Sequence, residues 1–143
     1  MKHSSSFTIA IKLLCFLLLG GCAAYTNQQN AAGNLYGSWI WKSSSGGFTG
    51  RQRITPESAG YTKIIHFSED GVYREFHDDE LVITLSYTVE MKKTIFGYHD
   101  VISFADSTGQ MMDKVIMQIS ETTLYLSEPC PDCFGHTYVR LNE

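Results

Sequence analysis

Residues 81–90 of the sequence are Leu-Val-Ile-Thr-Leu-Ser-Tyr-Thr-Val-Glu, and this stretch decides the fold class. Apolar side chains stand at Leu81, Ile83, Leu85, Tyr87 and Val89, with mostly polar residues between them. Successive side chains of a strand point to opposite faces, so a period of two predicts a strand with one buried and one wetter face. No part of the sequence shows a convincing apolar stripe at helical spacing.

The same composition continues on both sides of this strand. From Leu35 onward β-branched and aromatic residues dominate, interrupted by turn signals at residues 68–71, 78–80 and 106–109. The expected strands are 36–42, 48–54, 62–68, 72–77, 81–91, 95–105, 110–120, 122–127 and 135–141. Short connections favour an all-β, antiparallel up-and-down meander, and about eight or nine such strands can close into a small barrel. An open sandwich of the same strands is the alternative.

Composition limits the class of protein. The chain has 143 residues, of which 43% are hydrophobic, 18% charged and 13% aromatic. These values suit a single folded domain and not a disordered chain. Removing residues 1–21, which carry Lys2 and Lys12, leaves 9 basic and 15 acidic side chains, a net charge of −6. This negative balance speaks against nucleic acid as a partner.

The N-terminus has the pattern of a targeting segment. Lys2 precedes an apolar stretch whose uncharged part, Leu13–Leu19, is far shorter than the roughly 20 residues of a membrane helix and typical of a signal peptide. Leu19-Gly20-Gly21-Cys22 resembles the lipobox of bacterial lipoproteins, which implies cleavage before Cys22 and attachment of acyl chains such as palmitate to its thiol. An ordinary secreted protein with a Cys beside its cleavage site is the alternative.

These features set the expected organisation and location. Residues 1–21 form the lipoprotein signal peptide, 22–34 a flexible polar tether after the acylated Cys22, and 35–143 the β-barrel domain. Several acyl chains on one Cys anchor a protein stably to a bilayer. Ala23, where some lipoproteins have Asp, is similar to the outer-membrane sorting pattern, so we expect a lipid-anchored protein of the bacterial outer membrane.

Several short motifs resemble those of a known class of barrel. Gly37-Ser38-Trp39 in the first strand and Arg140 in the last are similar to the Gly-x-Trp and terminal Arg of lipocalin-like barrels. Residues 55–61, 70–73 and 136–140 are similar to small bacterial lipocalin-like lipoproteins. The resemblance implies a calycin-type barrel in which Arg140 packs across Trp39 and closes the floor. Unrelated core packing of Trp39 and a surface position for Arg140 are the alternative.

The segment Cys130-Pro131-Asp132-Cys133 has three interpretations. A local disulfide is favoured, because the cell envelope is oxidising and two Cys at this spacing can meet in a turn. A redox role is the second interpretation, because the segment resembles the Cys-Pro-x-Cys motif of disulfide oxidoreductases. In those proteins a helix follows the motif, and here none is expected. A zinc or copper site would use Cys130, Cys133 and His136, with His99 or Asp132 as a fourth ligand. We expect the disulfide, with no metal and no other cofactor.

Two further groups of residues, histidines and methionines, could form a functional site, but each has a structural explanation. His66 and His77 lie on neighbouring expected strands, where half-exposed structural histidines are common. Three methionines could bind copper through their sulfur atoms, but methionine in strands is more often core filler. They are Met111, Met112 and Met117.

The sequence contains no motif of a hydrolase elbow, a phosphate loop or a zinc protease, so we expect no enzyme. We expect a monomer that binds a small hydrophobic molecule in a shallow, aromatic-lined pocket, at the end of the barrel opposite Trp39 and Arg140. The alternative is an envelope interaction or sensor lipoprotein with a filled barrel and a functional Cys130–Cys133 loop. Filling would come from large aromatic residues, which would leave less than the roughly 300 Å³ of a usual pocket. They are Trp39, Trp41, Phe67, Phe76, Tyr87, Phe96, Phe104 and Tyr125.

Overall fold

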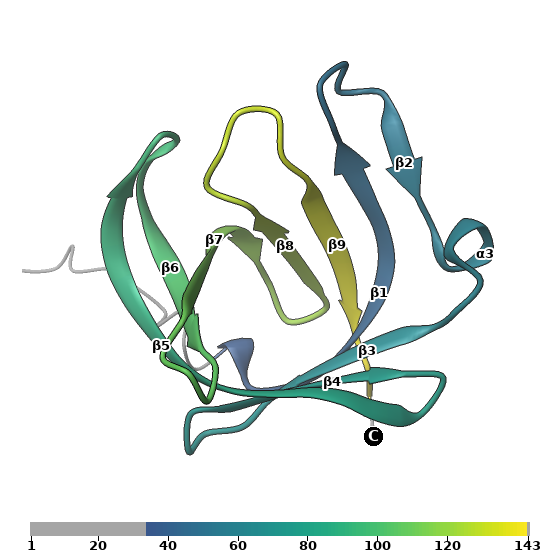
Figure 1. Ribbon diagram of the computed structural model, residues 1–143, viewed down its shortest axis with the longest axis horizontal. Helices are drawn as coiled ribbons and strands as arrows, with labels where there is room; N and C mark the ends of the chain where they lie inside the picture. Colours follow the sequence, from purple (N-terminus) through teal and green to yellow (C-terminus); the bar gives the residue numbers. More distant parts are fainter. Residues whose placement is uncertain (1–33, 143) are drawn as a thin grey trace, which may run out of the picture.

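The computed structural model describes residues 34–142, so the expected signal peptide and the lipid-attachment residue Cys22 lie outside the described residues. The described residues form nine antiparallel strands and the short helix α3, and Asn34 and Leu35 before the first strand are also helical (Figure 1). The elements are β1 (Gly37–Gly46), β2 (Gln52–Ile54), α3 (Pro56–Ala59), β3 (Lys63–Phe67), β4 (Val72–His77), β5 (Glu80–Thr94), β6 (Gly97–Ala105), β7 (Met111–Ile119), β8 (Thr123–Ser127) and β9 (Gly135–Arg140).

The nine strands make one sheet that closes into a ring. From β3 to β9 each strand pairs with the next in the sequence, and β1 pairs with both β3 and β9. β2 continues the sheet beside the last residues of β1, Ser44–Gly46, beyond the stretch that pairs with β3. This ring confirms the all-β, up-and-down barrel class and excludes the open sandwich.

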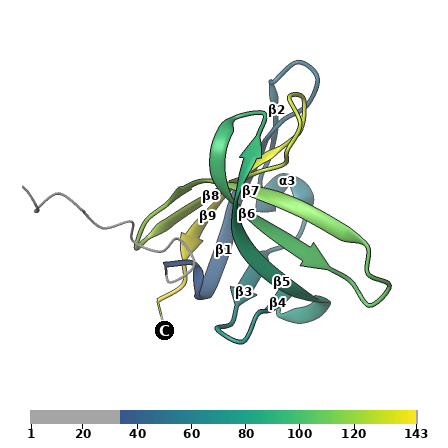
Figure 2. The same cartoon turned by 90° about the vertical axis from the view of Figure 1, so that its left-hand side faces the viewer.

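Two loops extend beyond the ring at the same end. Figure 2 shows the β1–β2 loop and the β8–β9 loop rising together above the strands. At their base, Gly46 lies so close to the carbonyl of Cys133 that a Cβ atom at this position would overlap it. The end of the ring from which these loops rise is called the mouth below, and the opposite end the floor.

Two local predictions differ from the structure. The strand expected at 48–54 is reduced to Gln52–Ile54, because Gly47 and Gly50 adopt positive φ angles of 81° and 65° and form a loop. The helix α3 was not expected, because four residues are too few to show an apolar period. Its signals are nevertheless local, since Thr55 caps the first turn and Gly60 ends it at a φ of 79°.

The expected turns are present. Gly71 and Gly109 close the β3–β4 and β6–β7 turns with φ angles of 80° and 81°, which glycine adopts without steric cost. Asp78 and Asp79 form the two-residue β4–β5 turn with φ angles of 47° and 67°. The turn predicted at residues 78–80 therefore connects two strands.

The core fills the floor half of the ring more than the mouth half. Of the aromatic residues expected to fill it, Trp39, Trp41, Phe67, Tyr87 and Phe104 are buried, whereas Phe76, Phe96 and Tyr125 are not. On β5, Tyr87 is 8% exposed but Leu81 and Ile83 are 54% and 38% exposed, so the predicted apolar face is buried only along part of the strand. Within residues 34–142, no helix is long and apolar enough to cross a membrane.

Candidate functional site

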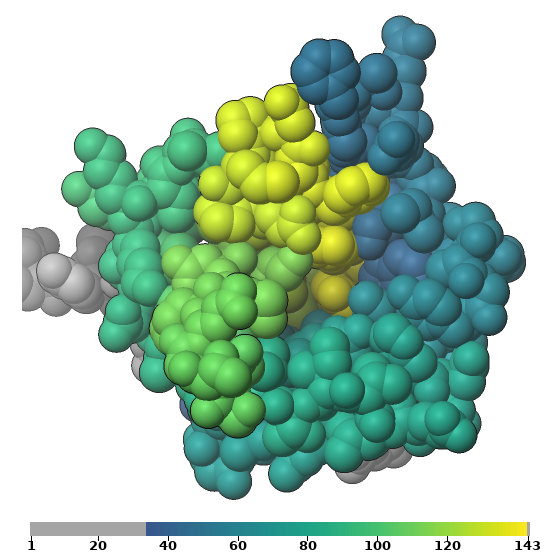
Figure 3. Space-filling model, in the orientation of Figure 1, coloured from purple at the N-terminus to yellow at the C-terminus, as the bar shows by residue number. Residues whose placement is uncertain are grey.

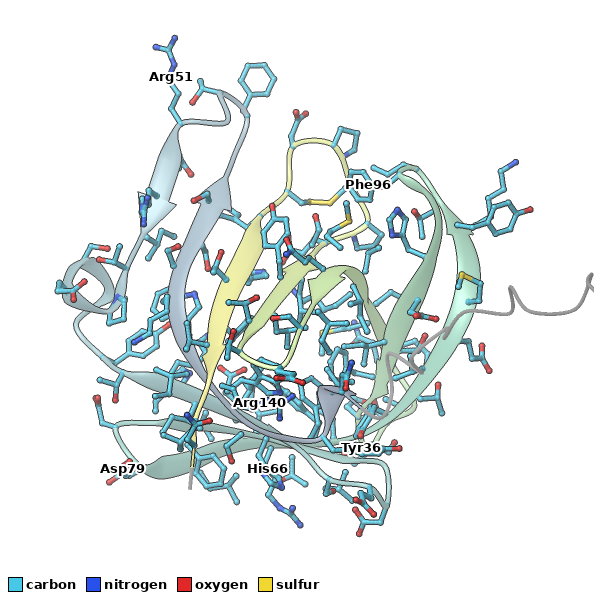
Figure 4. All side chains as sticks on the ribbon, turned by 180° about the vertical axis from the view of Figure 1, so that it is seen from behind. Tyr36, Arg51, His66, Asp79, Phe96 and Arg140 are labelled. Carbon is cyan, nitrogen blue, oxygen red and sulfur yellow. A yellow bond between two sulfur atoms is a disulfide. The ribbon has the colours of Figure 1, made fainter. Side chains whose placement is uncertain are left out.

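The floor of the ring is closed by Trp39 and Arg140. The Arg140 guanidinium lies 4.0 Å from the centre of the Trp39 ring, a distance at which a cation is attracted to the face of the indole. It also donates hydrogen bonds to the carbonyls of Tyr36, at 2.7 Å, and Glu121, at 2.6 Å. Arg140 and Tyr36 are both labelled in Figure 4, which views the ring from behind. The structure therefore places the predicted pair in contact.

The segment that enters β1 completes this seal. A third hydrogen bond from Arg140 reaches the carbonyl of Asn34, and the Trp39 indole N–H donates to the carbonyl of Leu35 at 2.8 Å. Leu35 is 0% exposed, so its side chain is fully packed against the core. Residues 34–36 are thus tied to Trp39 and Arg140 at the floor.

A pocket of about 130 Å³ lies inside the ring on the mouth side of this floor. In Figure 3 the surface is hollowed between β4 and β7, with β9 at the back of the hollow. Six apolar side chains line the pocket: Ile65, Ile83, Leu85, Phe104, Met112 and Leu126. Six polar side chains lie between them on the neighbouring strands: Lys63, Tyr73, Glu75, Lys114, His136 and Tyr138.

Strand alternation explains why these polar groups face inward. Along β9, Arg140, Tyr138 and His136 have the same parity, so they point into the ring in succession from floor to mouth. Lys63 and Ile65 on β3 follow the same rule. The inner face of the sheet thus carries Arg140 at the floor and Lys63 and His136 at the mouth.

The first polar cluster is centred on Glu75. Its carboxylate accepts hydrogen bonds from the Tyr73 hydroxyl, at 2.7 Å, and from the His77 imidazole, at 2.7 Å, and it pairs with the Lys63 ammonium at 3.4 Å. Burial alone would raise the pKa of the Glu75 carboxyl, but the bonds from Tyr73 and His77 and the charge of Lys63 outweigh burial and lower it. Glu75 is therefore ionised at neutral pH.

Aromatic rings extend this cluster toward the solvent. The Tyr61 ring stacks on His77 with centroids 4.3 Å apart, and it lies 6.1 Å from the Trp41 ring. The Lys63 ammonium lies 5.3 Å from the centre of the Trp41 ring. His77, predicted to be a structural residue, thus bonds to a residue that lines the pocket, whereas His66 bonds to Ser38; neither histidine lines the pocket itself.

The second polar cluster connects Glu128, Lys114 and His136. The Lys114 ammonium donates to the Glu128 carboxylate at 2.8 Å and to His136 Nε2 at 3.2 Å. Since an ammonium can only donate, Nε2 is the acceptor, and the ring proton belongs on Nδ1, which lies 2.7 Å from the Ser44 hydroxyl. The Trp41 indole N–H also donates to that hydroxyl, at 3.0 Å.

Electrostatics agree with a neutral His136. Burial, assisted by the positive charge of Lys114, lowers the pKa of the His136 imidazole to about 4. Burial would raise the pKa of the Glu128 carboxyl, but Lys114 and the Phe134 N–H outweigh burial and lower it. Burial raises the pKa of the Tyr138 hydroxyl above its ordinary value, so this group keeps its proton. At neutral pH the two lysines and two glutamates of both clusters therefore balance in charge.

The Cys130–Cys133 loop adjoins the second cluster. The two Cys are joined as a disulfide, with their Cα atoms 5.4 Å apart. Glu128 belongs to both structures, because its carbonyl accepts from the Cys130 N–H at 2.9 Å and its carboxylate accepts from the Phe134 N–H at 3.3 Å.

The predicted metal ligands are not brought together as a set. The group that could hold an ion comprises the two Cys sulfurs and a Glu128 oxygen, within 4.8 Å of one another, and does not include His136. His136 is instead directed to Ser44 and Lys114. Sulfurs joined in a disulfide offer no thiolate to a metal.

The expectation that the methionines fill the core is wrong for two of them. Met111 and Met112 are 58% and 49% exposed, because β7 begins at the rim of the ring, and Met112 lines the pocket. Met117, further along the same strand, is half-buried.

A larger groove of about 450 Å³ lies outside the ring, beside the β5–β6 hairpin. Val101 and Val115 lie at its base, on the sheet face opposite to the core residues Ile102 and Ile116. It is open to solvent and lacks the paired charges of the inner pocket. We therefore take the inner pocket as the candidate site.

Sequence reasoning missed Lys63, Glu75, Lys114 and Glu128. For three of them the sequence held a signal, because each charged residue stands two positions from a buried residue of the same strand and so shares its face. The pairs are Lys63 and Ile65, Glu75 and Tyr73, and Lys114 and Ile116. Glu128 follows the last residue of β8, where alternation gives no guide.

Comparison of the chain with protein-family models, with curated proteins and with solved structures found no match.

Proposed function

We propose that this chain is a lipid-anchored, lipocalin-like lipoprotein of the bacterial cell envelope that binds a small, largely apolar molecule in the pocket inside the ring. The observation that carries the proposal is the contrast between the two ends of the ring. The floor is closed by the contact between Trp39 and Arg140, whereas the mouth holds a cavity lined by six apolar side chains with polar side chains between them. Concave, mainly apolar cavities with a few placed polar groups are typical binding sites.

The size of the pocket restricts the ligand. About 130 Å³ is below the roughly 300 Å³ of a usual ligand pocket, as expected of a largely filled barrel, so the pocket takes only a small molecule or one end of a longer one. Ile83 and Met112 line the pocket and are also 38% and 49% exposed. The remainder of a longer ligand would lie against these two side chains at the rim.

Binding of an environment-sensitive apolar dye to the full-length chain tests the proposal. We expect saturable binding of one dye per chain. Ile83→Trp should fill the pocket entrance and weaken binding about tenfold or more, because the added ring occupies the space of the dye. Thr84→Trp is the matched control, since Thr84 is the exposed neighbour on the outer face of β5 and its variant should bind the dye as the original chain does. Equal binding by both variants would contradict a site inside the ring.

The lipid anchor has a separate test. Cys22→Ser removes the thiol that would carry the acyl chains, so the variant should appear in the soluble fraction after cell breakage. A variant that stays with the membranes to the same extent as the original chain would overturn the anchor but not the pocket.

A second function is favoured by the position of Glu128. Because this residue bonds to both the disulfide loop and Lys114, a partner that displaced the loop would also disturb the pocket. This link supports an interaction or sensor lipoprotein in which the loop is the contact surface. If the folded chain binds no apolar probe and hydrogen exchange is uniformly slow inside the ring, this second function replaces the first.

A further inference from the structure

One edge of the β5–β6 hairpin has no neighbouring strand among the described residues. Residues 88–94 of β5 pair with β6, but the pairing of β5 with β4 ends at Ser86. Within residues 34–142, no other strand pairs with this stretch of β5. Figure 2 shows the end of the hairpin standing clear of β3 and β4. The outer side of β5 is therefore an open sheet edge, whose backbone groups can bond to another strand.

Three residues turn their backbone groups to this open edge. The Tyr87 N–H donates to the Gly71 carbonyl at 2.8 Å, so it points away from β6. The backbone groups of a strand alternate in direction, and the pairing of β5 with β6 runs from residue 86 to residue 94 without a shift in register. Every second residue after Tyr87 therefore points its N–H and C=O groups to the open side. These residues are Val89, Met91 and Lys93.

The charges along this edge are complementary to themselves. Residues 88–94 are Thr-Val-Glu-Met-Lys-Lys-Thr. When two copies of this strand pair antiparallel with Met91 opposite Met91, Glu90 of each copy lies opposite Lys92 of the other. Opposite charges in such cross-strand positions stabilise the pairing. The Glu90 and Lys92 side chains are 65% and 37% exposed, so both are accessible to a second strand.

Backbone hydrogen bonding and charge select the same register. Only residues that point their backbone groups outward can exchange bonds across the edge, so the registers with the longest overlap are centred on Glu90, Met91 or Lys92. A centre at Glu90 places two glutamates opposite each other, and a centre at Lys92 places two lysines opposite each other. Like charges in these positions are destabilising. The centre at Met91 avoids both, and it uses the outward groups of all three residues.

Lys92 has the capacity for this contact. Its ammonium donates to the Ser103 hydroxyl at 2.7 Å and lies 3.9 Å from the Glu90 carboxylate of its own strand. An ammonium has three N–H groups, so Lys92 can bond to a carboxylate of a second copy without releasing Ser103.

We propose that two copies of this chain associate through the open edge of β5, with Met91 opposite Met91, and form one sheet that continues across both rings. The partner is a second copy of the chain, in contrast to the monomer expected from the sequence. The two-fold axis through Met91 makes every contact occur twice. Figure 1 shows the end of the hairpin at the mouth, so in an antiparallel pair the two mouths point in opposite directions. The interface lies outside the pocket and does not depend on its ligand.

Charge swaps test the register on the full-length chain purified in detergent, with sedimentation giving the dissociation constant of the dimer. Glu90→Lys should raise this constant about tenfold or more, because two attractive pairs become repulsive, and Lys92→Glu should act in the same way. The double variant restores opposite charges and should return the constant to within about threefold of its original value. Glu80→Lys is the matched control, because Glu80 is an exposed residue of β5 that pairs with His77 of β4, so its variant should leave the constant unchanged.

Cross-linking of Met91→Cys in membranes tests the contact at the two-fold axis. In the proposed pair the Cα atoms of the two residues at this position are about 5.5 Å apart, a distance that a disulfide spans. A mild oxidant should therefore join two chains of this variant into a dimer on a non-reducing gel. Tyr98→Cys is the matched control, because Tyr98 is 73% exposed but lies on β6, on the other side of the hairpin. It should form far less of the joined dimer.

The outcomes are distinct. A dimer that each single charge variant weakens, that the double variant restores and that Met91→Cys traps is the expected result. A dimer that Glu90→Lys leaves intact, or that the double variant fails to restore, overturns pairing in this register. If Met91→Cys forms no more joined dimer than Tyr98→Cys, association through this edge is overturned. The cross-linking comparison decides alone where a charge variant fails to fold or where detergent keeps the chains apart.

Discussion

Replacing Arg140 with Ala should lower the free energy of unfolding by about 4 kcal/mol. The two hydrogen bonds from the guanidinium to the carbonyls of Asn34 and Tyr36 are partly buried, and each contributes roughly 1.5 kcal/mol as a bond from a charged donor. The contact with the Trp39 ring, at 4.0 Å, contributes roughly 1 kcal/mol. The bond to the Glu121 carbonyl is exposed, so we assign it little.

A double-mutant cycle isolates the contact between the two side chains. Trp39→Leu keeps an apolar side chain but removes the indole face and its bond to the Leu35 carbonyl. If Arg140 packs on that face, each substitution makes the other less costly, and we expect a coupling energy of about 1 kcal/mol. Urea unfolding of the original chain, the two single variants and the double variant, followed by circular dichroism, gives the four free energies.

Two comparisons make this reasoning refutable. Arg53→Ala removes an exposed arginine on β2 and should change the free energy of unfolding by less than about 0.5 kcal/mol. If the losses in free energy of unfolding for Trp39→Leu and Arg140→Ala add up to the loss of the double variant within about 0.3 kcal/mol, the contact across the floor is refuted. A loss of less than about 1 kcal/mol for Arg140→Ala would also refute the assigned hydrogen bonds.

Three other predictions follow from single features. The pKa of His136 is lowered to about 4 in the folded chain and is about 6.5 in the unfolded chain, so between these pH values the unfolded chain binds one more proton. The free energy of unfolding, measured in urea, should therefore fall by about 3 kcal/mol as the pH drops from 6.5 to 4. His136→Asn should remove this pH-dependent loss. Asp79→Gly should raise the melting temperature by an amount equivalent to about 1 kcal/mol, since glycine adopts the φ of 67° more easily, whereas Asp79→Ala should not. Replacing Cys130 and Cys133 with Ser should cost about 2 kcal/mol, the chain entropy of so short a loop, without abolishing folding in calorimetry.

Most of the fold could be predicted because its signals are local. The period of two in residues 81–90, the glycines of the turns and the aromatic residues between them each report on a few neighbours, and the ring follows from pairing consecutive strands. β2 was overestimated for a similar reason. Its sequence suits a strand, but Gly47 and Gly50 carry the chain around a loop and leave only Gln52–Ile54 paired with β1.

The polar side chains that line the pocket could not be predicted in the same way. Alternation shows which residues share a face of the sheet, but not how far water reaches along that face into the ring. In a tilted barrel, depth depends on the stagger between strands, which is a property of the closed ring. The register places Ile65 opposite Glu75 and Lys63 opposite His77, so Lys63 and Glu75 meet on a diagonal.

That stagger also decides what the site can recognise. Both carboxylates at the mouth pair with lysines that line the pocket, Glu75 with Lys63 and Glu128 with Lys114, so the two ion pairs carry no net charge. Tyr138 lines the same pocket. Because the ion pairs already fix the donors in place, a ligand meets a preorganised site and loses little to reorganisation. Selectivity in this ring should therefore depend on how a ligand places its polar groups against these two ion pairs.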